Sequence, residues 1–159
     1  MDSKNATKLL LDRLDLQIIQ EMMNNAEISY VELGKKLFVS GGTIHVRTKK
    51  LEELKVITGK RLTIDLRSLG YDVIAFIGIY LEKSSMYDDV AKELKKIPHV
   101  VRVNYTTGNY SMFAEIMCKD IAQLRFVLHD ELQKIKGIER TETLISLEES
   151  FNRNVMVLV

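Results

Sequence analysis

The chain has 159 residues, of which 46% are hydrophobic and 28% are charged, and its formal net charge is +1. This is the composition of an ordinary globular protein, and the longest apolar run, Val73 to Leu81, is too short to span a bilayer, which argues against a membrane protein. The single cysteine, Cys118, excludes an internal disulfide and a cysteine-based metal cluster, as expected for a protein of the cytoplasm.

The first residues, MDSKNATKLLLDR, contain no apolar stretch with a cleavage site, so we interpret them as a ragged leader and not as an export signal. A first helix is predicted to follow Asp12, which can cap it, and to end near Asn24. Its inward residues recur at helical spacing and are Leu14, Ile18, Ile19 and Met22.

A short second helix is predicted to begin after Ser29. Ser29 and Glu32 have the spacing of a capping box, in which each side chain accepts a hydrogen bond from the other residue's backbone N–H. Leu33 and Leu37 then point inward, and Gly34 leaves room for another helix to cross closely.

A third helix is predicted from Gly41 to Leu54, with Ser40 as its cap. Its inward residues are Ile44, Thr48 and Leu51. Three short helices with a tight connection between the second and third have the layout of a helix-turn-helix, whose third helix enters the major groove of DNA. Only Phe38 and Val39 separate the second helix from Ser40, so the connection is tight enough for this motif.

The charge of this region supports double-stranded DNA as a partner. Six basic and two acidic residues lie between Thr43 and Arg61, which is a candidate footprint for a polyanion. A solvated basic face on a small helical bundle is the simpler alternative. The residues that we expect to contact DNA are Ser40, Gly41, Gly42, Thr43, His45, Val46, Arg47, Lys49, Lys50, Lys60 and Arg61.

These residues are predicted to have different roles. Gly41 and Gly42 let the backbone approach a phosphate, where free N–H groups favour an anion. Thr43 and His45 are the candidates to touch base edges. The Lys and Arg side chains are candidates for phosphates, which supply affinity and salt dependence but little sequence choice.

The segment VITGKRLTI, residues 56–64, is predicted to form a turn and a strand. Its Lys60 and Arg61 either form a wing against the DNA backbone or begin a linker. The predicted domains are therefore a DNA-binding domain at residues 1–64, a linker at 65–71 and a second domain at 72–159.

The second half has the predicted order β-α-β-β-α-β, which is typical of a ferredoxin-like sandwich in an α+β protein. Its predicted strands are 72–81, 99–107, 110–118 and 138–149. One helix follows Ser84 and stops at Pro98, with Val90, Ala91, Leu94 and Ile97 inward. The other follows Asp120, ends at Gly137, and has an apolar stripe of Ile121, Leu124, Leu128, Leu132 and Ile135.

The first of these strands is apolar on both faces, with Ile77 and Ile79 on one side and Phe76 and Tyr80 on the other. A strand with one wet face alternates cleanly, and two helices cover only one side of such a sheet. We therefore expect a second copy of the chain to cover the other face, which makes the protein at least a homodimer.

The stretch YTTGNYSMF, Tyr105 to Phe113, has two interpretations. Gly108-Asn109 between two apolar runs predicts a two-residue hairpin turn that joins the two central strands. Alternatively, the backbone amides at this turn bind the carboxylate of a free amino acid, and the hydroxyls of Thr107, Tyr110 and Ser111 accept from its ammonium.

Several motifs together resemble those of the Lrp/AsnC family of regulators. These are LDRLD at Leu11–Asp15, SGGTIHVR at Ser40–Arg47, ITG at Ile57–Gly59 and LGYD at Leu69–Asp72. Within the family, the pieces GTIHVR, ITGKR, LGYDV, TTGNYS and TETLISL are most similar to the asparagine-sensing branch, and the likeness runs from about Leu11 to about Ser150. One departure is Phe38, which stands where many relatives have glycine in the turn before the third helix.

The resemblance implies a winged helix-turn-helix joined to an αβ-sandwich that senses an amino acid, with asparagine favoured. It also implies homodimers that assemble into an octamer or a related ring, with the effector between neighbouring dimers. Gln133 is a candidate to read the effector's side chain, with Gln123 as its competitor. The effector residues implied are Tyr105, Thr106, Thr107, Gly108, Asn109, Tyr110, Ser111 and Gln133.

We expect no enzymatic activity, no metal and no cofactor apart from the amino acid effector. The sequence contains no G-x-S-x-G, P-loop or H-E-x-x-H motif, and the consecutive His129, Asp130 and Glu131 point in different directions from a helix. The alternatives are an architectural protein that coats DNA without sensing, and an amino-acid-sensing subunit of an enzyme.

Overall fold

The computed structural model describes residues 11–157, so the leader predicted at the N-terminus lies, up to residue 10, outside the described residues. The described chain forms two compact units. Unit 1 comprises residues 11–63 together with 151–157, and unit 2 comprises residues 64–150. The sequence assigned residues 151–159 to the second domain, whereas those described here, up to 157, group with the helices of unit 1.

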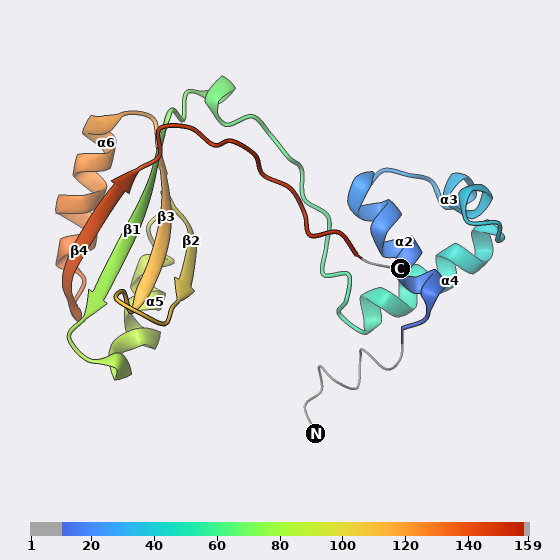
Figure 1. Ribbon diagram of the computed structural model, residues 1–159, viewed down its shortest axis with the longest axis horizontal. Coiled ribbons are helices and arrows are strands. Elements are labelled where there is room, and N and C mark those ends of the chain that lie inside the picture. The colour runs from blue at the N-terminus through green and yellow to red at the C-terminus, as the bar shows by residue number, and fades with distance from the viewer. Residues whose placement is uncertain (1–10, 158–159) are drawn as a thin grey trace. The chain divides into compact units, whose positions relative to one another are not determined.

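The three predicted helices of unit 1 are confirmed as α2 (Arg13–Asn24), α3 (Tyr30–Lys36) and α4 (Gly41–Glu53) (Figure 1). They enclose a core whose side chains are fully or almost fully buried, namely Ile18, Met22, Leu33, Ile44 and Leu51. Thr48 is buried as predicted, next to this core, and its hydroxyl lies 3.9 Å from the sulfur of Met22.

Each helix begins at a side-chain cap. The Ser29 hydroxyl accepts from the Glu32 N–H at 3.1 Å, and the Ser40 hydroxyl accepts from the Thr43 N–H at 3.0 Å. The full capping box, predicted at Ser29, is found instead at Asp12, where Asp15 Oδ2 accepts from the Asp12 N–H at 3.2 Å and Asp12 Oδ1 accepts from the Asp15 N–H. The start of α2 therefore brings two carboxylates together.

The turn between α3 and α4 forces Phe38 into the left-handed backbone region, with φ of 58°. The Val39 N–H donates to the Gly34 carbonyl at 2.9 Å and the Phe38 N–H to the Lys35 carbonyl at 3.4 Å, which is the bonding pattern of a Schellman motif. The ring of Phe38 is 95% exposed, so it contributes no packing to offset this conformation. The departure seen in the sequence is thus a residue in a conformation that glycine adopts more easily.

The predicted strand at residues 56–64 is wrong, because no strand is formed between α4 and the sheet of unit 2. A strand needs a hydrogen-bonded neighbour, and none of the described strands pairs with this segment. Val56 and Ile57, at its start, pack against the helical core of unit 1, whereas Leu62 is 88% exposed and Ile64 is 51% exposed. Lys60 and Arg61 therefore lie on an extended, exposed segment.

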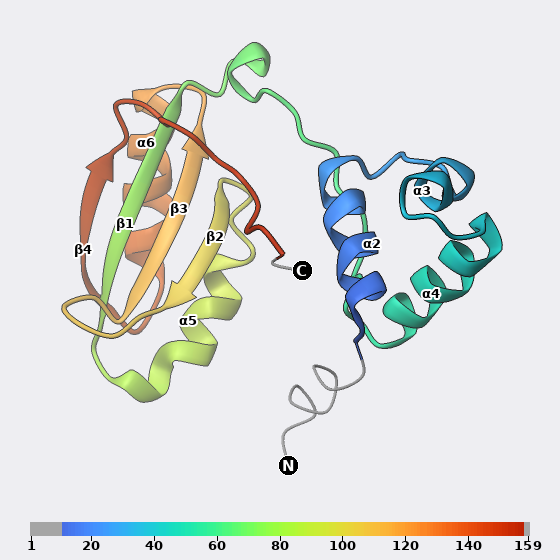
Figure 2. The same ribbon diagram turned by 45° about the vertical axis from the view of Figure 1, so that its right-hand side comes forward.

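Unit 2 confirms the predicted β-α-β-β-α-β order. It consists of β1 (Val73–Leu81), α5 (Tyr87–Leu94), β2 (Val100–Tyr105), β3 (Met112–Cys118), α6 (Ile121–Phe126) and β4 (Ile138–Ile145), with short turns η1 (Arg67–Leu69) and η2 (Ser84–Met86). The antiparallel sheet has the strand order β2-β3-β1-β4, and α5 and α6 lie on one face of it (Figure 2). The hairpin at Gly108 therefore joins edge strand β2 to β3 and does not join the two central strands.

The helix-covered face of the sheet carries the core of unit 2. Alternate residues of β1 and β3 point into it, and among them Ala75, Ile77, Ile79, Ala114, Ile116 and Cys118 are fully buried. The helices supply Val90, Leu94, Leu124, Val127 and Leu132. Burial of this kind raises the pKa of the Cys118 thiol, so Cys118 acts as a small apolar residue of the core.

The predicted helix after Asp120 is interrupted. After α6, residues Val127–Glu131 form a π-helical turn (η3) and Leu132–Lys134 a 3₁₀ turn (η4). The Leu132 N–H donates to the Val127 carbonyl, five residues back, so the turn holds one extra residue, and Val127 and Leu132 are both buried. Ile121, predicted to face inward, is 57% exposed.

The opposite face of the sheet carries aromatic side chains that are only partly buried. The rings of Phe76 and Phe113 stack with centroids 5.9 Å apart, and those of Tyr80 and Tyr110 meet edge to face at 5.3 Å. We call this the open face.

Strand β4, predicted to reach Glu149, ends at Ile145. In the C-terminal segment after it, the Val157 N–H donates to Gln20 Oε1 of α2 at 2.7 Å.

No helix in the described part of the chain is both long and apolar enough to cross a membrane. Within residues 11–157, no three His, Cys, Asp or Glu side chains come close enough together to hold a metal ion.

We predict that Phe38→Gly stabilises the protein. A non-glycine residue in the left-handed region costs about 1–2 kcal/mol, and the substitution removes this cost. Part of the gain in stability is lost again, because glycine raises the conformational entropy of the unfolded chain. Urea denaturation should show the unfolding free energy of unit 1 to rise by about 0.5–1 kcal/mol. Phe38→Ala is the control, since it removes the ring but keeps the strain, and a gain equal to that of Phe38→Gly would contradict this explanation.

Candidate nucleic-acid interface and effector loop

The N-terminus of α4 is built for close approach of the backbone. Gly41 lies against α3, where a Cβ would meet the Tyr30 carbonyl oxygen at 3.3 Å, a tight contact, so this glycine lets the two helices pack closely. Gly42 is exposed, and a Cβ there would meet only the Ser40 hydroxyl, at 3.7 Å. Gly42 therefore leaves the first turn of α4 open to an outside ligand. Thr43 faces this turn, with its hydroxyl 2.9 Å from that of Ser40.

The outer side of α4 presents His45, Val46 and Lys49, all of which are exposed. The ring of His45 lies beside that of Tyr30, with centroids 5.6 Å apart. Val46 is 67% exposed, which leaves its side chain available for contact. These three residues and Gly42 are exposed on the predicted recognition helix, as are Lys50, Glu52 and Glu53.

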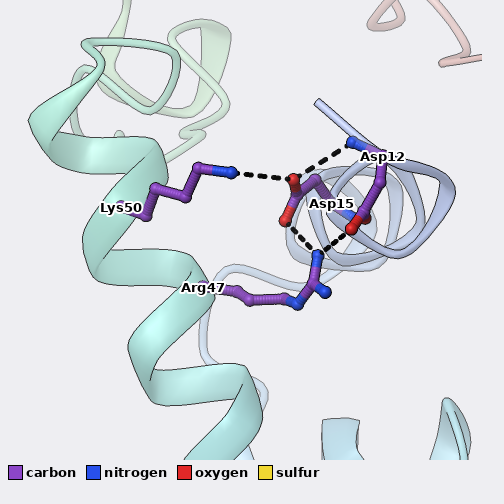
Figure 3. A network of polar contacts seen from close by, with 4 residues as sticks. All are labelled: Asp12, Asp15, Arg47 and Lys50. Carbon is purple, nitrogen blue, oxygen red and sulfur yellow. Dashed lines mark hydrogen bonds and ion pairs between the residues drawn. The ribbon is translucent and has the colours of Figure 1, made fainter. Parts of the chain in front are cut away.

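Arg47 has a different environment from the other predicted DNA contacts. Its Nη1 atom lies 2.5 Å from Asp12 Oδ2 and 2.9 Å from Asp15 Oδ1, so it links α4 to the start of α2 (Figure 3). Lys50 reaches the same carboxylate, with Nζ 3.6 Å from Asp15 Oδ2. Asp15 has no exposed side-chain surface, so its charge depends on these two cations.

The ion pairs among Asp12, Asp15 and Arg47 shift the pKa values of Asp12 and Arg47. The hydrogen bond from Arg47 lowers the pKa of the Asp12 carboxyl, helped by the Asp15 N–H. Hydrogen bonds to Asp12 and Asp15 raise the pKa of Arg47. Both groups stay charged at neutral pH, and Arg47 is thus held by α2 and not presented to solvent as a mobile cation.

The predicted two-residue turn at Gly108-Asn109 is wrong. The strands end at Tyr105 and resume at Met112, and the Thr106 N–H donates to the Ser111 carbonyl at 3.1 Å. A two-residue type I′ turn needs positive φ at both central residues, and here Gly108 alone has it, at 101°. The connection is a longer loop, residues 106–111, which we call the effector loop.

Three predicted effector residues in this loop already make hydrogen bonds within the loop or to β1. The Thr106 hydroxyl donates to the Tyr110 carbonyl at 2.8 Å, the Ser111 N–H donates to the Ile79 carbonyl, and the Ser111 hydroxyl accepts from the Leu81 N–H at 3.4 Å. Tyr105 lies outside the loop and its ring contacts Tyr87 at 4.6 Å. The exposed tip of the loop is Thr107, Gly108 and Asn109.

The side chain of Tyr110 leaves the loop and lies on the open face. Its hydroxyl donates to Glu142 Oε2 at 2.8 Å, and the Tyr80 hydroxyl donates to Glu142 Oε1 at 3.0 Å. Arg140 also donates to Oε1 at 3.1 Å and stacks 3.6 Å from the centre of the Tyr80 ring. The bonds from Tyr110 and Tyr80 lower the pKa of the Glu142 carboxyl, and that carboxylate raises the pKa of Tyr110, so the contact persists at neutral pH.

Gln133, predicted to complete the effector site, is not brought to the effector loop of its own chain. It is exposed and lines a groove of about 370 Å³ between α6 and the edge strand β4. The groove is lined by Ile121, Leu124, Arg125, Leu128, His129, Gln133, Thr143 and Ile145. None of the loop residues 105–111 belongs to this lining. Gln123, the competitor, accepts from the Lys119 N–H at 2.7 Å and so acts as a local cap.

Three residues of these sites were not singled out by the sequence analysis. Asp15 had a local signal, since Asp12 and Asp15 have capping-box spacing. Gly78 of β1 lies under the Tyr110 ring, where a Cβ would be 2.8 Å from Tyr110 Cγ. Gly78 and Glu142 had no local signal, because each contacts Tyr110, a residue distant in the sequence.

Comparison with known proteins agrees with this two-unit arrangement. The AsnC-type helix-turn-helix domain matches residues 11–52, and the Lrp/AsnC ligand binding domain matches residues 74–156. The chain is 42% identical to the regulatory protein AsnC of Escherichia coli over 146 residues, covering 92% of this chain and 96% of that protein. It is 43% identical to the AsnC protein of Haemophilus influenzae over 145 residues, covering 91% and 97%.

Two solved structures have the same fold. The structure of Escherichia coli AsnC matches with a TM-score of 0.87 at 40% identity and covers 92% of this chain and 98% of that chain. A Neisseria meningitidis transcriptional regulator in complex with L-Met matches with a TM-score of 0.86 at 21% identity, covering 94% and 96%, which is a likeness of fold alone.

We predict that Arg47→Ala destabilises unit 1. It leaves the buried Asp15 carboxylate short of its nearest cation, which should lower the unfolding free energy by about 2–3 kcal/mol in urea denaturation at pH 7. Because the pKa of Asp12 is lowered by Arg47, this difference should be present above about pH 4 and shrink only as acid protonates the Asp12 carboxyl. A loss below 0.5 kcal/mol would show that the network contributes little.

Proposed function

The chain belongs to the Lrp/AsnC family of transcriptional regulators, and on this premise we propose that it binds double-stranded DNA through α4 in response to a free amino acid, asparagine first. The observation that carries the proposal is a helix-turn-helix with an open first turn of α4, in the same chain as a family ligand-binding domain. Relatives that are 42–43% identical over 91–92% of this chain are regulatory proteins named AsnC.

The proposed DNA contacts divide into two groups. Ser40, Gly42, Thr43 and the outer side of α4 face the groove, with His45 and Val46 as candidates for base edges. Lys49 is the candidate for a phosphate on this helix, and Lys60 and Arg61 extend the contact from their exposed segment. Arg47 and Lys50, although on the same helix, hold α4 in place through Asp15.

The effector is proposed to bind at the tip of the effector loop. Thr107, Gly108 and Asn109 are exposed, and Gly108 has the positive φ that turns successive amides toward a carboxylate. A regulator of the same fold has been solved with L-Met, which supports a free amino acid as the class of ligand. Gln133 lies elsewhere in its own chain, so we propose that a neighbouring subunit brings it to the loop.

Assembly follows from the open face. Phe76, Phe113 and Leu144 leave apolar surface on a sheet whose other side is already covered by α5 and α6. We propose that a second copy covers this face, that such dimers form an octamer or a related ring in the cytoplasm, and that the effector acts between dimers. The functional division that we propose is DNA binding at residues 1–64, a linker at 65–71, and sensing and assembly at 72–159, of which residues 151–157 group with the helices of unit 1.

DNA binding is tested by its salt dependence. Lys49→Ala should reduce the slope of log K against log salt by about one, since each phosphate contact contributes about 0.9. Lys92→Ala is the matched control, because it removes the same charge from α5 in unit 2 and should leave the slope unchanged. Equal slopes for Lys49→Ala and the wild type would remove Lys49 from the interface.

Amino acid sensing is tested by calorimetry of the full chain against the twenty amino acids, followed by mobility shift with DNA. We expect asparagine to bind most tightly and to change the amount of shifted DNA. Gly108→Val should abolish the binding and leave a folded protein, because valine is strained at positive φ. Salt-dependent DNA binding that no amino acid alters would instead identify an architectural protein.

A further inference from the structure

Glu142 is the point where the effector loop is attached to the sheet. Its two carboxylate oxygens accept from Tyr110 of the loop, Tyr80 of β1 and Arg140 of β4. Of these three donors, Tyr110 alone comes from the effector loop. The Tyr110–Glu142 bond, at 2.8 Å, is the shortest of the three and has a charged acceptor, so it is a strong hydrogen bond.

Gly78 of β1 makes room for this attachment. A Cβ at this position would lie 2.8 Å from Tyr110 Cγ and closer still to Cδ1 and Cε1, so the ring lies directly over the glycine. Gly78 is not among the residues with positive φ, so nothing in its backbone conformation requires glycine. The reason for a glycine in the middle of a central strand is therefore the space taken by the Tyr110 ring.

The contacts that hold Tyr110 in place also hold the two ends of the effector loop. The Thr106 hydroxyl donates to the Tyr110 carbonyl, and the neighbouring Ser111 is bonded to β1 through the Ile79 carbonyl. The tip of the loop, Thr107 to Asn109, is thus held between two anchored ends. A loop anchored in this way loses less conformational entropy when it binds a ligand.

We infer that Glu142 and Gly78 position the effector loop through Tyr110, and that Tyr110 holds the loop in its binding conformation and does not itself contact the effector's ammonium. The inference rests on the proposed function, because it gives the loop's role as an amino acid site. It assigns a positioning role to two residues that lie on the sheet and outside the loop.

The same contact joins the loop to the open face. The ring of Tyr110 lies edge to face with Tyr80 and 5.9 Å from Phe113, both of which belong to that face. A change in the position of the loop therefore moves an aromatic group on the surface that a second copy would cover. This gives a physical route by which a bound amino acid alters assembly.

The test compares two tyrosines that donate to the same carboxylate. Tyr110→Phe and Tyr80→Phe each remove one hydroxyl and keep the ring, but only Tyr110 belongs to the loop. Calorimetry with asparagine at pH 7.5 should show an affinity about tenfold weaker for Tyr110→Phe and less than threefold weaker for Tyr80→Phe. The thermal midpoint should differ little between the two variants, since the same kind of bond is lost in both.

Gly78→Ala tests the role of the Tyr110 ring's position without removing any hydrogen-bonding group. Its methyl group collides with the Tyr110 ring, so the ring must leave the sheet, and we expect a loss of affinity at least as large as for Tyr110→Phe. If Gly78→Ala does not fold, as judged by circular dichroism, the comparison of the two tyrosine variants decides alone.

The outcomes separate this inference from the proposed function. If the wild-type protein binds asparagine and Tyr110→Phe matches Tyr80→Phe, the positioning role is overturned while the amino acid site stands. If the wild-type protein binds none of the twenty amino acids, the proposed function fails and this inference with it. If Tyr110→Phe weakens the affinity for asparagine and Tyr80→Phe does not, the result supports both the proposed function and the positioning role.

Discussion

The buried carboxylate of Asp15 is the constraint on which the DNA-binding unit depends. A carboxylate without contact to water must be paired, and Asp15 is paired by Arg47 and Lys50 of α4. This pairing sets how the third helix lies against the first. It also means that charge on a recognition helix is not equivalent to charge available for DNA, because Arg47 is held by α2 while Lys49, two residues away, is exposed.

A comparable arrangement occurs in unit 2, where Glu142 gathers Tyr80, Tyr110 and Arg140. The two networks differ in burial, and the one around Glu142 lies on the partly exposed open face. In both, a carboxylate on one element fixes a side chain from a distant part of the chain. The regulator that we propose therefore has its recognition helix and its effector loop each fixed by one acidic residue.

The sequence predicted the helices and strands well because their signals are local. Ser29 and Ser40 cap α3 and α4 where expected, and the inward sets Ile44, Thr48 and Leu51 of α4 are buried. The strand at residues 56–64 was wrong because β-propensity cannot supply the neighbour that a strand needs. The stripe from Ile121 to Ile135 missed Val127, because the π-turn lets residues five apart, Val127 and Leu132, face the core together.

The sequence by itself determined the two-unit organisation, the order of the helices and strands in each unit, and the family. Periodicity, caps and motif spacing are properties of neighbouring residues, so one chain is enough to read them. The tertiary structure decided which side chains are free. Arg47 meets Asp15 across 32 residues of sequence, and Tyr110 meets Glu142 across another 32, so only folding shows that these groups are already engaged.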